Sequence, residues 1–109
     1  MKTLSIKERK EMLKGVAKAK ATIFKLLGNE NRIEILYELF ESEKNWTEIN
    51  DELQMNPKLM RDHLNYLIKY RIVEKKDNIY SLTDLGADMC ELNLGINKSD
   101  IEKLYDSHI

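Results

Sequence analysis

The sequence contains few of the residues that build cross-linked, turn-rich or membrane-spanning proteins. Its 109 residues include one cysteine, one proline and four glycines. A single cysteine excludes an internal disulfide and a metal site built from a cysteine cluster, and so few prolines and glycines disfavour turn-rich β architectures. No apolar run approaches the roughly 18 residues of a membrane span, and the first residues lack the hydrophobic stretch of a signal peptide. We therefore expect a cytoplasmic protein that has no membrane partner.

The residues that are plentiful indicate one small, mostly helical domain. Hydrophobic residues make up 42% of the chain and charged residues 34%. This balance is too apolar for a disordered chain and too polar for a membrane protein. Leu, Lys and Glu are common, and all three favour helices. The length fits one compact domain.

Basic and acidic side chains are segregated along the chain, although the net charge is only −1. Residues 1–28 carry eight basic and two acidic side chains, whereas residues 29–56 carry two basic and eight acidic ones. Residues 57–80 are again basic, with six cations against three anions, and residues 81–109 are acidic. A polyanion such as DNA would be drawn to the first and third segments. Solvated helix faces are the alternative interpretation of these charge runs.

The apolar residues from Lys7 to Leu27 recur at spacings of three and four, which predicts one long amphipathic helix that ends at Gly28. Its apolar face is wider than one small domain needs. We therefore expect a homodimer whose interface contains Met12, Val16, Ala19, Ile23 and Leu26. Lysines on the other side form either a solubilising face or a second surface that contacts DNA.

The next segment has the pattern of a helix-turn-helix. A helix is expected from Glu30 to about Glu41, with Tyr37 and Phe40 in the core together with Trp46. Thr47 can cap a short helix that runs to Leu53. After three residues, Asn56 can cap a helix that has Pro57 at its first position, runs to about Tyr70, and packs on Met60, Leu64 and Leu67.

A change to strand-like residues follows this second helix. The runs 72–76 and 79–82 flank Asp77 and Asn78, which tolerate the positive φ of a two-residue hairpin turn. Thr83 can cap a further helix that ends near residues 95–97, and Ser99 with Glu102 forms a capping box for a last one. The expected fold is mainly α with a small β-hairpin, a winged helix-turn-helix that has extra helices at both ends. Its parts are residues 1–28 for dimerisation, 29–83 for the winged core and 84–109 for support of the dimer.

Several short runs are similar to the arsenic-repressor (ArsR) family of winged-helix regulators, particularly its small archaeal members. The run from Leu27 to Leu36 resembles the start of the family domain, the residues around His63 its recognition helix, and the run from Leu82 to Gly86 the end of its wing. The resemblance covers roughly residues 22–90. It implies a DNA-binding transcriptional regulator, a repressor in many such proteins. The helix at about 57–70 would then enter the major groove, and the hairpin 72–82 would serve as the wing.

The chain lacks the metal-sensing residues that many members of this family carry. The stretch Trp46 to Asp51 has no cysteine where metal sensors often place a pair. Near the end of the chain, Asp100, Glu102, Asp106 and His108 lack a second histidine and the spacing of metal ligands. We therefore expect no metal and no other cofactor.

The exposed side of the second helix of the helix-turn-helix carries the expected DNA contacts. Arg61 and Asn65 are suited to base edges, and Lys58 and Lys69 to phosphates. Asp62 is unfavourable near phosphates unless it pairs with Lys58 or Arg61 or accepts a hydrogen bond from cytosine. The complete expected set is Thr47, Asn56, Lys58, Arg61, Asn65, Lys69, Lys75, Lys76 and Asn78. The expected partner is double-stranded DNA, read as an inverted repeat by the homodimer.

A winged-helix module that binds another protein of a transcription complex is the alternative function. The acidic helix 30–41 offers a surface for such a partner, with Glu30, Glu34, Glu38 and Glu41. An enzyme is not expected, because the sequence has no phosphate loop, no paired nucleophile and base, and no metal set. His63 and Cys90 are interpreted as packing residues.

Overall fold

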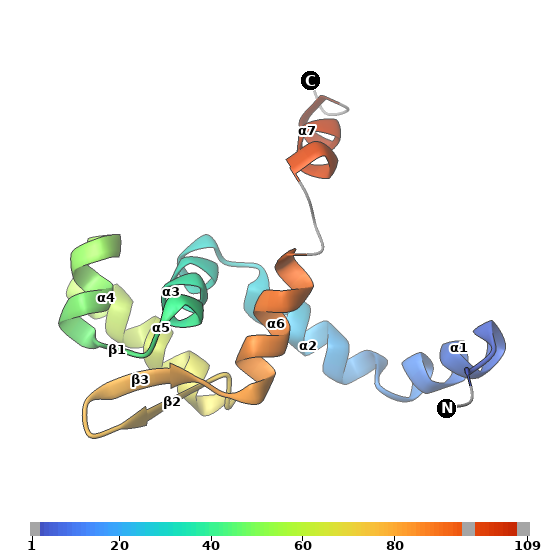
Figure 1. The fold of residues 1–109 in the computed structure, drawn as a ribbon, viewed down its shortest axis with the longest axis horizontal. Helices are drawn as coiled ribbons and strands as arrows, with labels where there is room; N and C mark the ends of the chain where they lie inside the picture. The colour runs from blue at the N-terminus through green and yellow to red at the C-terminus, as the bar shows by residue number, and fades with distance from the viewer. Residues whose placement is uncertain (1–2, 95–97, 107–109) are drawn as a thin grey trace. The chain divides into compact units, whose positions relative to one another are not determined.

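A computed structural model describes residues 3–94 and 98–106 of the chain (Figure 1). The chain divides into two compact units, Met1–Glu30 and Asn31–Ile109, which are described separately. No helix among the described residues is long and apolar enough to cross a membrane.

The first unit contains two helices, α1 (Ile6–Gly15) and α2 (Ala17–Leu27), where the sequence predicted one. The prediction of a single long helix was wrong because the backbone leaves helical geometry at Val16, where φ is −119° and ψ is 12°. The Val16 amide donates to the carbonyl of Leu13 at 3.2 Å, a tightened bond of the kind that ends a helix. Gly15, which destabilises a helix, directly precedes the break. At the other end of α1, Ser5 and Glu8 form a capping box.

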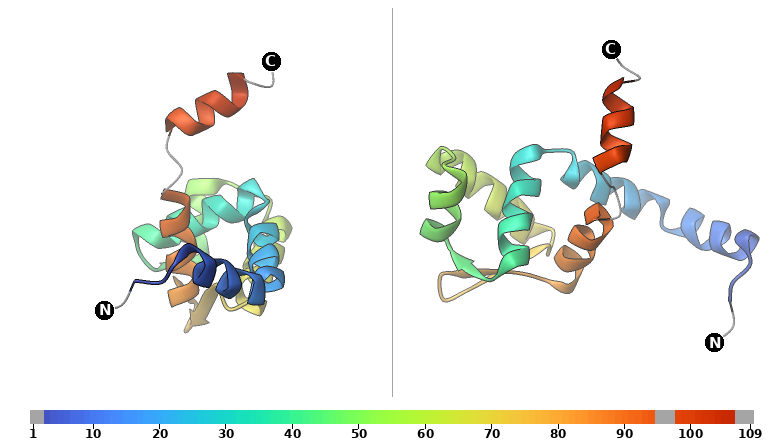
Figure 2. Two further views of the ribbon diagram at one scale, coloured as in Figure 1. Left: turned by 90° about the vertical axis from the view of Figure 1, so that its right-hand side faces the viewer. Right: turned by 45° about the horizontal axis from the view of Figure 1, so that its top comes forward.

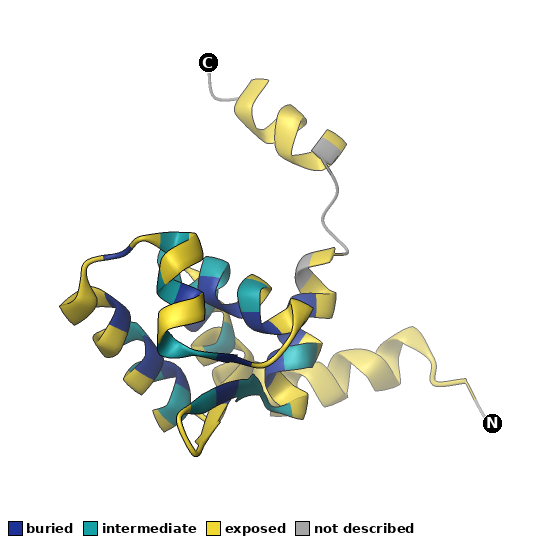
Figure 3. Cartoon of the chain, turned by 60° about the vertical axis from the view of Figure 1, so that its left-hand side comes forward, coloured by how far each residue is buried: buried dark blue, intermediate teal, exposed yellow. Residues whose placement is uncertain are grey.

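The second unit contains the helix-turn-helix, made by α3 (Glu30–Glu41), α4 (Trp46–Leu53) and α5 (Pro57–Lys69). Figure 2 shows these helices beside the β-hairpin, and Figure 3 marks their buried positions in dark blue. The sequence pattern correctly predicted the inward residues of α5 and the cap of that helix at Asn56, whose side chain accepts from the amides of Lys58 and Leu59. The buried residues of the three helices are Ile35, Leu36, Leu39, Ile49, Met60, Leu64 and Leu67.

The start of α4 differs from the prediction. Asn45, and not Thr47, caps the helix: its side chain accepts from the Glu48 amide at 2.8 Å, and the Glu48 carboxylate accepts from the Asn45 amide at 3.0 Å. Asn is among the best N-cap residues, and a glutamate three residues later completes a capping box. Thr47 therefore lies in the first turn of α4.

A three-stranded antiparallel sheet, in the order β1-β3-β2, forms the wing. The hairpin of β2 (Val73–Lys76) and β3 (Ile79–Leu82) has the predicted two-residue turn, with φ of 50° at Asp77 and 66° at Asn78. Strand β1 (Lys44–Asn45), which pairs with β3, was not predicted from the sequence. A strand of two polar residues has no hydrophobic alternation by which it could be recognised.

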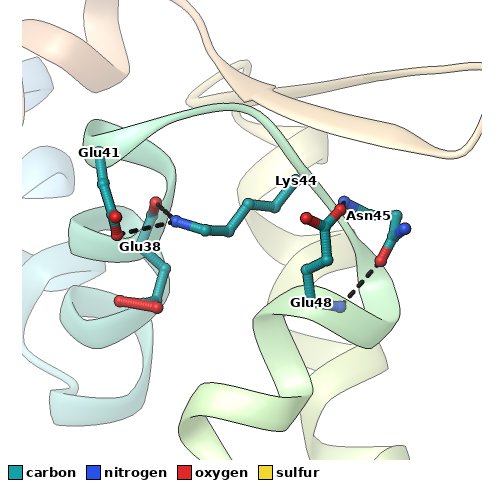
Figure 4. Close-up of polar contacts among 5 residues, drawn as sticks. All are labelled: Glu38, Glu41, Lys44, Asn45 and Glu48. Atoms are coloured by element: carbon teal, nitrogen blue, oxygen red, sulfur yellow. Dashed lines mark hydrogen bonds and ion pairs between the residues drawn. The ribbon is translucent and has the colours of Figure 1, made fainter.

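The buried side chain of Lys44 connects β1 to the end of α3 (Figure 4). Its ammonium group donates to the carbonyl of Glu38 at 2.6 Å and to the Glu41 carboxylate at 3.1 Å. The last carbonyls of a helix lack partners within the helix and attract positive charge. Lys44 thus satisfies the C-terminus of α3 from the strand that follows it.

After the wing, Thr83 caps α6 (Asp84–Leu94) as predicted, because its hydroxyl oxygen accepts from the Gly86 amide at 3.1 Å. The same hydroxyl lies 2.6 Å from the carbonyl of Arg71, to which it donates. The last helix, α7 (Lys98–Asp106), begins before Ser99, so the predicted cap at Ser99 was wrong. The predicted break at residues 95–97 lies outside the described residues.

Two aromatic residues expected in the core are exposed. Tyr37 is 47% exposed and Phe40 is 43% exposed, whereas Trp46 is half-buried. Helical spacing alone did not separate the two sides of α3. The side that packs inward is formed by Ile35, Leu36 and Leu39.

Gly86 lies where a side chain does not fit. A Cβ atom at this position would overlap the backbone carbonyl oxygen of Ile72. We expect Gly86→Ala to lower the free energy of unfolding by about 1–3 kcal/mol, the usual cost of overpacking. The measurement is urea denaturation followed by circular dichroism.

Gly15→Ala is the matched control, because a Cβ atom at Gly15 has nothing within 4 Å. Alanine is the better helix former, so this variant should be at least as stable as the wild type and no less helical. An equal loss of stability in both variants would show that the contact of Gly86 with Ile72 is not the cause.

Candidate nucleic-acid interface

Residues from three separate elements line one hollow on the second unit. They come from the start of α4, the start of α5 and the hairpin. We call this the wing hollow, and its lining consists of Asn45, Trp46, Thr47, Pro57, Arg61, Lys75, Asn78 and Tyr80. The structure thus brings together four predicted residues: Thr47, Arg61, Lys75 and Asn78. The hollow has two cationic side chains, polar groups and two aromatic rings, which suits a polyanion that also carries apolar bases.

The exposed side of α5 carries the remaining candidates. Lys58, Arg61, Asn65 and Lys69 are exposed, on the side opposite the buried residues of the helix. The guanidinium N–H donors of an arginine and the side-chain amide of an asparagine match base edges, whereas a lysine is a point charge suited to phosphate.

Asp62 has a partner on its own helix. Its carboxylate lies 3.3 Å from the Lys58 ammonium, one turn earlier. Both side chains are largely exposed, so the pair contributes only about 0.3–0.5 kcal/mol. Lys58 therefore offsets the acidic charge on the exposed side of α5 without fixing its own position strongly.

Asn56 has a structural role as well as a predicted DNA contact. Its side-chain oxygen accepts from the amides of Lys58 at 2.9 Å and Leu59 at 3.3 Å. These bonds satisfy donors that the first turn of a helix leaves free. The side-chain oxygen of Asn56 is thus occupied by the cap of α5.

The two lysines of β2 differ in their surroundings. Lys75 pairs across the hairpin with Tyr80, its ammonium 5.5 Å from the centre of that ring, and it lines the wing hollow. Lys76 does not line the wing hollow but lies in another depression, with the acidic residues Glu43, Glu74 and Asp77. Lys75 also lines this second depression, so the two lysines differ in that Lys75 alone reaches the wing hollow.

Aromatic and cationic side chains also hold α5 against α3. The guanidinium carbon of Arg32 lies 4.6 Å from the centre of the Tyr66 ring, and that ring packs edge-on against Tyr70 at 4.9 Å. The Lys69 ammonium lies 5.6 Å from the Tyr70 ring. The contact of Arg32 with Tyr66 was missed at the level of sequence, because it joins residues that are far apart in the chain.

His63 lies on α5 beside Arg32. Burial, and next the positive charge of Arg32, lower the pKa of His63 below its ordinary value of 6.5, while Asp62 acts in the opposite direction. Among the described residues, the buried Nε2 atom of His63 has no hydrogen-bond partner. Both observations favour a neutral, packed imidazole.

Cys90 is buried, and its Sγ atom lies 3.7 Å from the carbonyl of Leu36. Burial, and next the charge of Glu91, raise the pKa of this thiol. A thiol of this kind is a packing group and a poor nucleophile. Within residues 3–94 and 98–106, no group of three or more His, Cys, Asp or Glu side chains could hold a metal ion.

The lowered pKa of His63 predicts a pH dependence of stability. Well above pH 6.5, His63 is neutral in both the folded and the unfolded chain. As the pH falls below 6.5, the unfolded chain binds the proton first, so the free energy of unfolding decreases until the folded-state pKa has been passed. We expect thermal unfolding of the wild type to shift downward from pH 7.5 to pH 5.5 more than that of His63→Gln.

His108 is present in both proteins and cancels in this comparison. Equal pH shifts in the two proteins would contradict the assignment to His63.

Comparison with known proteins identifies the domain. Residues 29–75 match the family described as bacterial regulatory protein, ArsR family. These residues extend from the start of α3 into β2. A search of curated proteins finds no match.

Solved structures share the fold over most of the chain. The quinone-bound YodB of B. subtilis is 25% identical, with 83% of this chain and 96% of that chain covered and a TM-score of 0.64. Rv0081 of M. tuberculosis is 26% identical, with 87% and 99% covered and a TM-score of 0.65. The transcriptional repressor BigR of Xylella fastidiosa is 23% identical, with 80% and 88% covered and a TM-score of 0.68.

The match at residues 29–75 confirms the resemblance to the ArsR family, which the sequence indicated over roughly residues 22–90. The helices, the turn and the wing have the order that the winged-helix fold requires. Residues 29–75 thus match the ArsR-family model, and the chain is a winged-helix, DNA-binding transcriptional regulator.

Proposed function

We propose that the chain is a sequence-specific repressor that acts in the cytoplasm as a homodimer on an inverted-repeat operator, and that it is not an enzyme. The observation that carries this proposal is the wing hollow, where Thr47, Arg61 and Lys75 of three different elements lie together. The repressor role is supported by the fold shared with BigR, which is itself a transcriptional repressor.

In this proposal, α5 enters the major groove. Arg61 and Asn65 read base edges, while Lys58 and Lys69 contact phosphates. The starts of α4 and α5 and the inner face of the wing then meet the DNA around the wing hollow, with Thr47, Lys75 and Asn78 contacting the backbone. Lys76, which is outside the wing hollow, contacts phosphate only.

The N-terminal helices provide the proposed dimer interface. Met12 is 62% exposed and Val16 is 44% exposed, and both line an apolar groove with Leu4 and Leu13. Ala19 is also exposed, Ile23 is half-buried, and Leu26, at 3% exposure, is already buried in the single chain. The interface therefore uses Met12, Val16 and Ala19 chiefly, and α6 and α7 support it.

The proposed contacts of Arg61 and Lys76 differ in kind and can be separated by salt titration. Arg61→Ala should weaken binding to the preferred site by about 1–3 kcal/mol and remove discrimination at one base position. Lys76→Ala should weaken specific and scrambled duplexes about equally and reduce the slope of log K against log salt by about one. The preferred site is obtained by selection from random DNA.

Lys103→Ala removes the same charge from α7 and serves as the control, so its affinity should match that of the wild type. If wild-type binding to specific and scrambled duplexes is equally weak and indifferent to Arg61, the chain is not a sequence reader, and the protein-interaction function takes its place.

The dimer prediction is tested by sedimentation at micromolar concentration. The wild type should have twice the mass of the 12.9 kDa chain. Met12→Glu with Val16→Glu should give monomers, because a carboxylate in an apolar interface is costly. Ala21→Glu, on the lysine side of α2, is the control and should remain dimeric. A wild-type monomer that binds operator DNA one to one would contradict the prediction.

A further inference from the structure

The outer face of α3, next to its buried residues, carries an apolar stripe. Ile33, Tyr37 and Phe40 follow one another at spacings of four and three, so they lie on one side of the helix. Tyr37 and Phe40 are 47% and 43% exposed. Large aromatic side chains that stay in water on a helix that already packs inward mark a surface suited to a partner.

An acidic stripe runs beside this apolar one. Glu30, Glu34 and Glu41 lie at spacings of four and seven along the same side of α3. Glu41 accepts from Lys44, yet its side chain remains 72% exposed. With four glutamates and one arginine, α3 has a net charge of −3. Its partner should therefore be an amphipathic helix with basic and apolar stripes side by side.

The helix α1 has this complementary pattern. None of its ten described residues is buried, and Ile6 and Leu13 are 82% and 59% exposed. Lys7, Lys10 and Lys14 lie beside this apolar pair, at spacings of three and four. Of the two glutamates of α1, Glu8 lies away from this pair, and Glu11 lies at the far edge of the lysines. The lysines and the apolar pair together match the two stripes of α3.

Packing is the missing contribution to the stability of α1. The helix is capped by its own Ser5 and Glu8, but an isolated helix shorter than about 12–15 residues is marginal in water. A surface that covers Ile6 and Leu13 and neutralises the lysines would stabilise α1 by packing against it.

We propose that α1 of a second copy docks on the outer face of α3, its apolar pair against Tyr37 and Phe40 and its lysines against Glu34 and Glu41. The inference rests on the proposed homodimer and names a surface within it. Two-fold symmetry gives two such contacts, since each copy contributes one α1 and one α3. The contacts are partly electrostatic, so raising the salt concentration weakens the dimer.

A charge-swap experiment tests the docking. One variant carries Glu30→Lys and Glu34→Lys on the acidic stripe of α3, which leaves the ion pair of Glu41 with Lys44 intact, and the other carries Lys10→Glu and Lys14→Glu on α1. Each alone should dimerise at least about tenfold more weakly than the wild type, because like charges face each other in both contacts. An equimolar mixture should form a one-to-one heterodimer of wild-type affinity, since both contacts then join opposite charges. Sedimentation measures the association, and circular dichroism verifies that each variant is folded.

Matched variants isolate the surface from general charge effects. Asp51→Lys with Glu52→Lys makes the same charge change on exposed residues of α4 and should dimerise like the wild type. Tyr37→Gln with Phe40→Gln removes the apolar stripe without touching the charges and should also weaken the dimer, with an unchanged melting temperature of the monomer.

Three outcomes would contradict the proposed docking, and they differ in their consequences for the proposed homodimer and the DNA-binding function. Unchanged dimerisation of both charge variants leaves the homodimer and the DNA function intact. If the mixture does not recover dimerisation, and a single chain that carries all four substitutions does, then α1 packs on the α3 of its own chain. A wild type that is monomeric refutes the proposed homodimer as well.

Discussion

The buried ammonium group of Lys44 is the contact on which the helix-turn-helix depends. It closes the C-terminus of α3 through the carbonyl of Glu38 and the carboxylate of Glu41, while its own backbone pairs with β3. The next residue, Asn45, caps α4. A buried amine is costly unless hydrogen bonds and opposite charge compensate it, and here both do. One two-residue strand thereby fixes the end of one helix, the start of the next and the edge of the wing.

Local chemistry explains why much of the fold could be predicted from the sequence. The caps at Asn56 and Thr83 and the hairpin turn at Asp77 and Asn78 depend on neighbouring residues alone, and all three were predicted correctly. The errors have other causes. Thr47 and Asn45 are both good caps, but Asn45 also has Glu48 three residues later for a capping box and pairs with a distant strand through β1. The exposure of Tyr37 follows from which side of α3 packs inward, which its own spacing does not determine.

In the candidate site, too, some features follow from local sequence and others from tertiary packing. The exposed side of α5 was predictable because Met60, Leu64 and Leu67 define its buried side. The proximity of α5 to Trp46 and Tyr80 in the wing hollow could not be predicted, because it depends on the tertiary arrangement of α4, α5 and the hairpin. The contact of Arg32 with Tyr66 is likewise tertiary. Sequence thus indicates which residue types face solvent, and packing decides which of them act together.

The length of the wing limits the length of DNA that one copy can contact. Strands β2 and β3 have four residues each, which corresponds to about 13 Å at the usual rise of a strand. One turn of duplex measures about 34 Å, so a hairpin of this length stays within the groove next to α5. In the proposed complex each copy has a compact footprint, and most of the sequence information of the operator is concentrated in the few base pairs that contact α5. Regulators with this short wing would gain selectivity from the spacing between half-sites and not from longer half-sites.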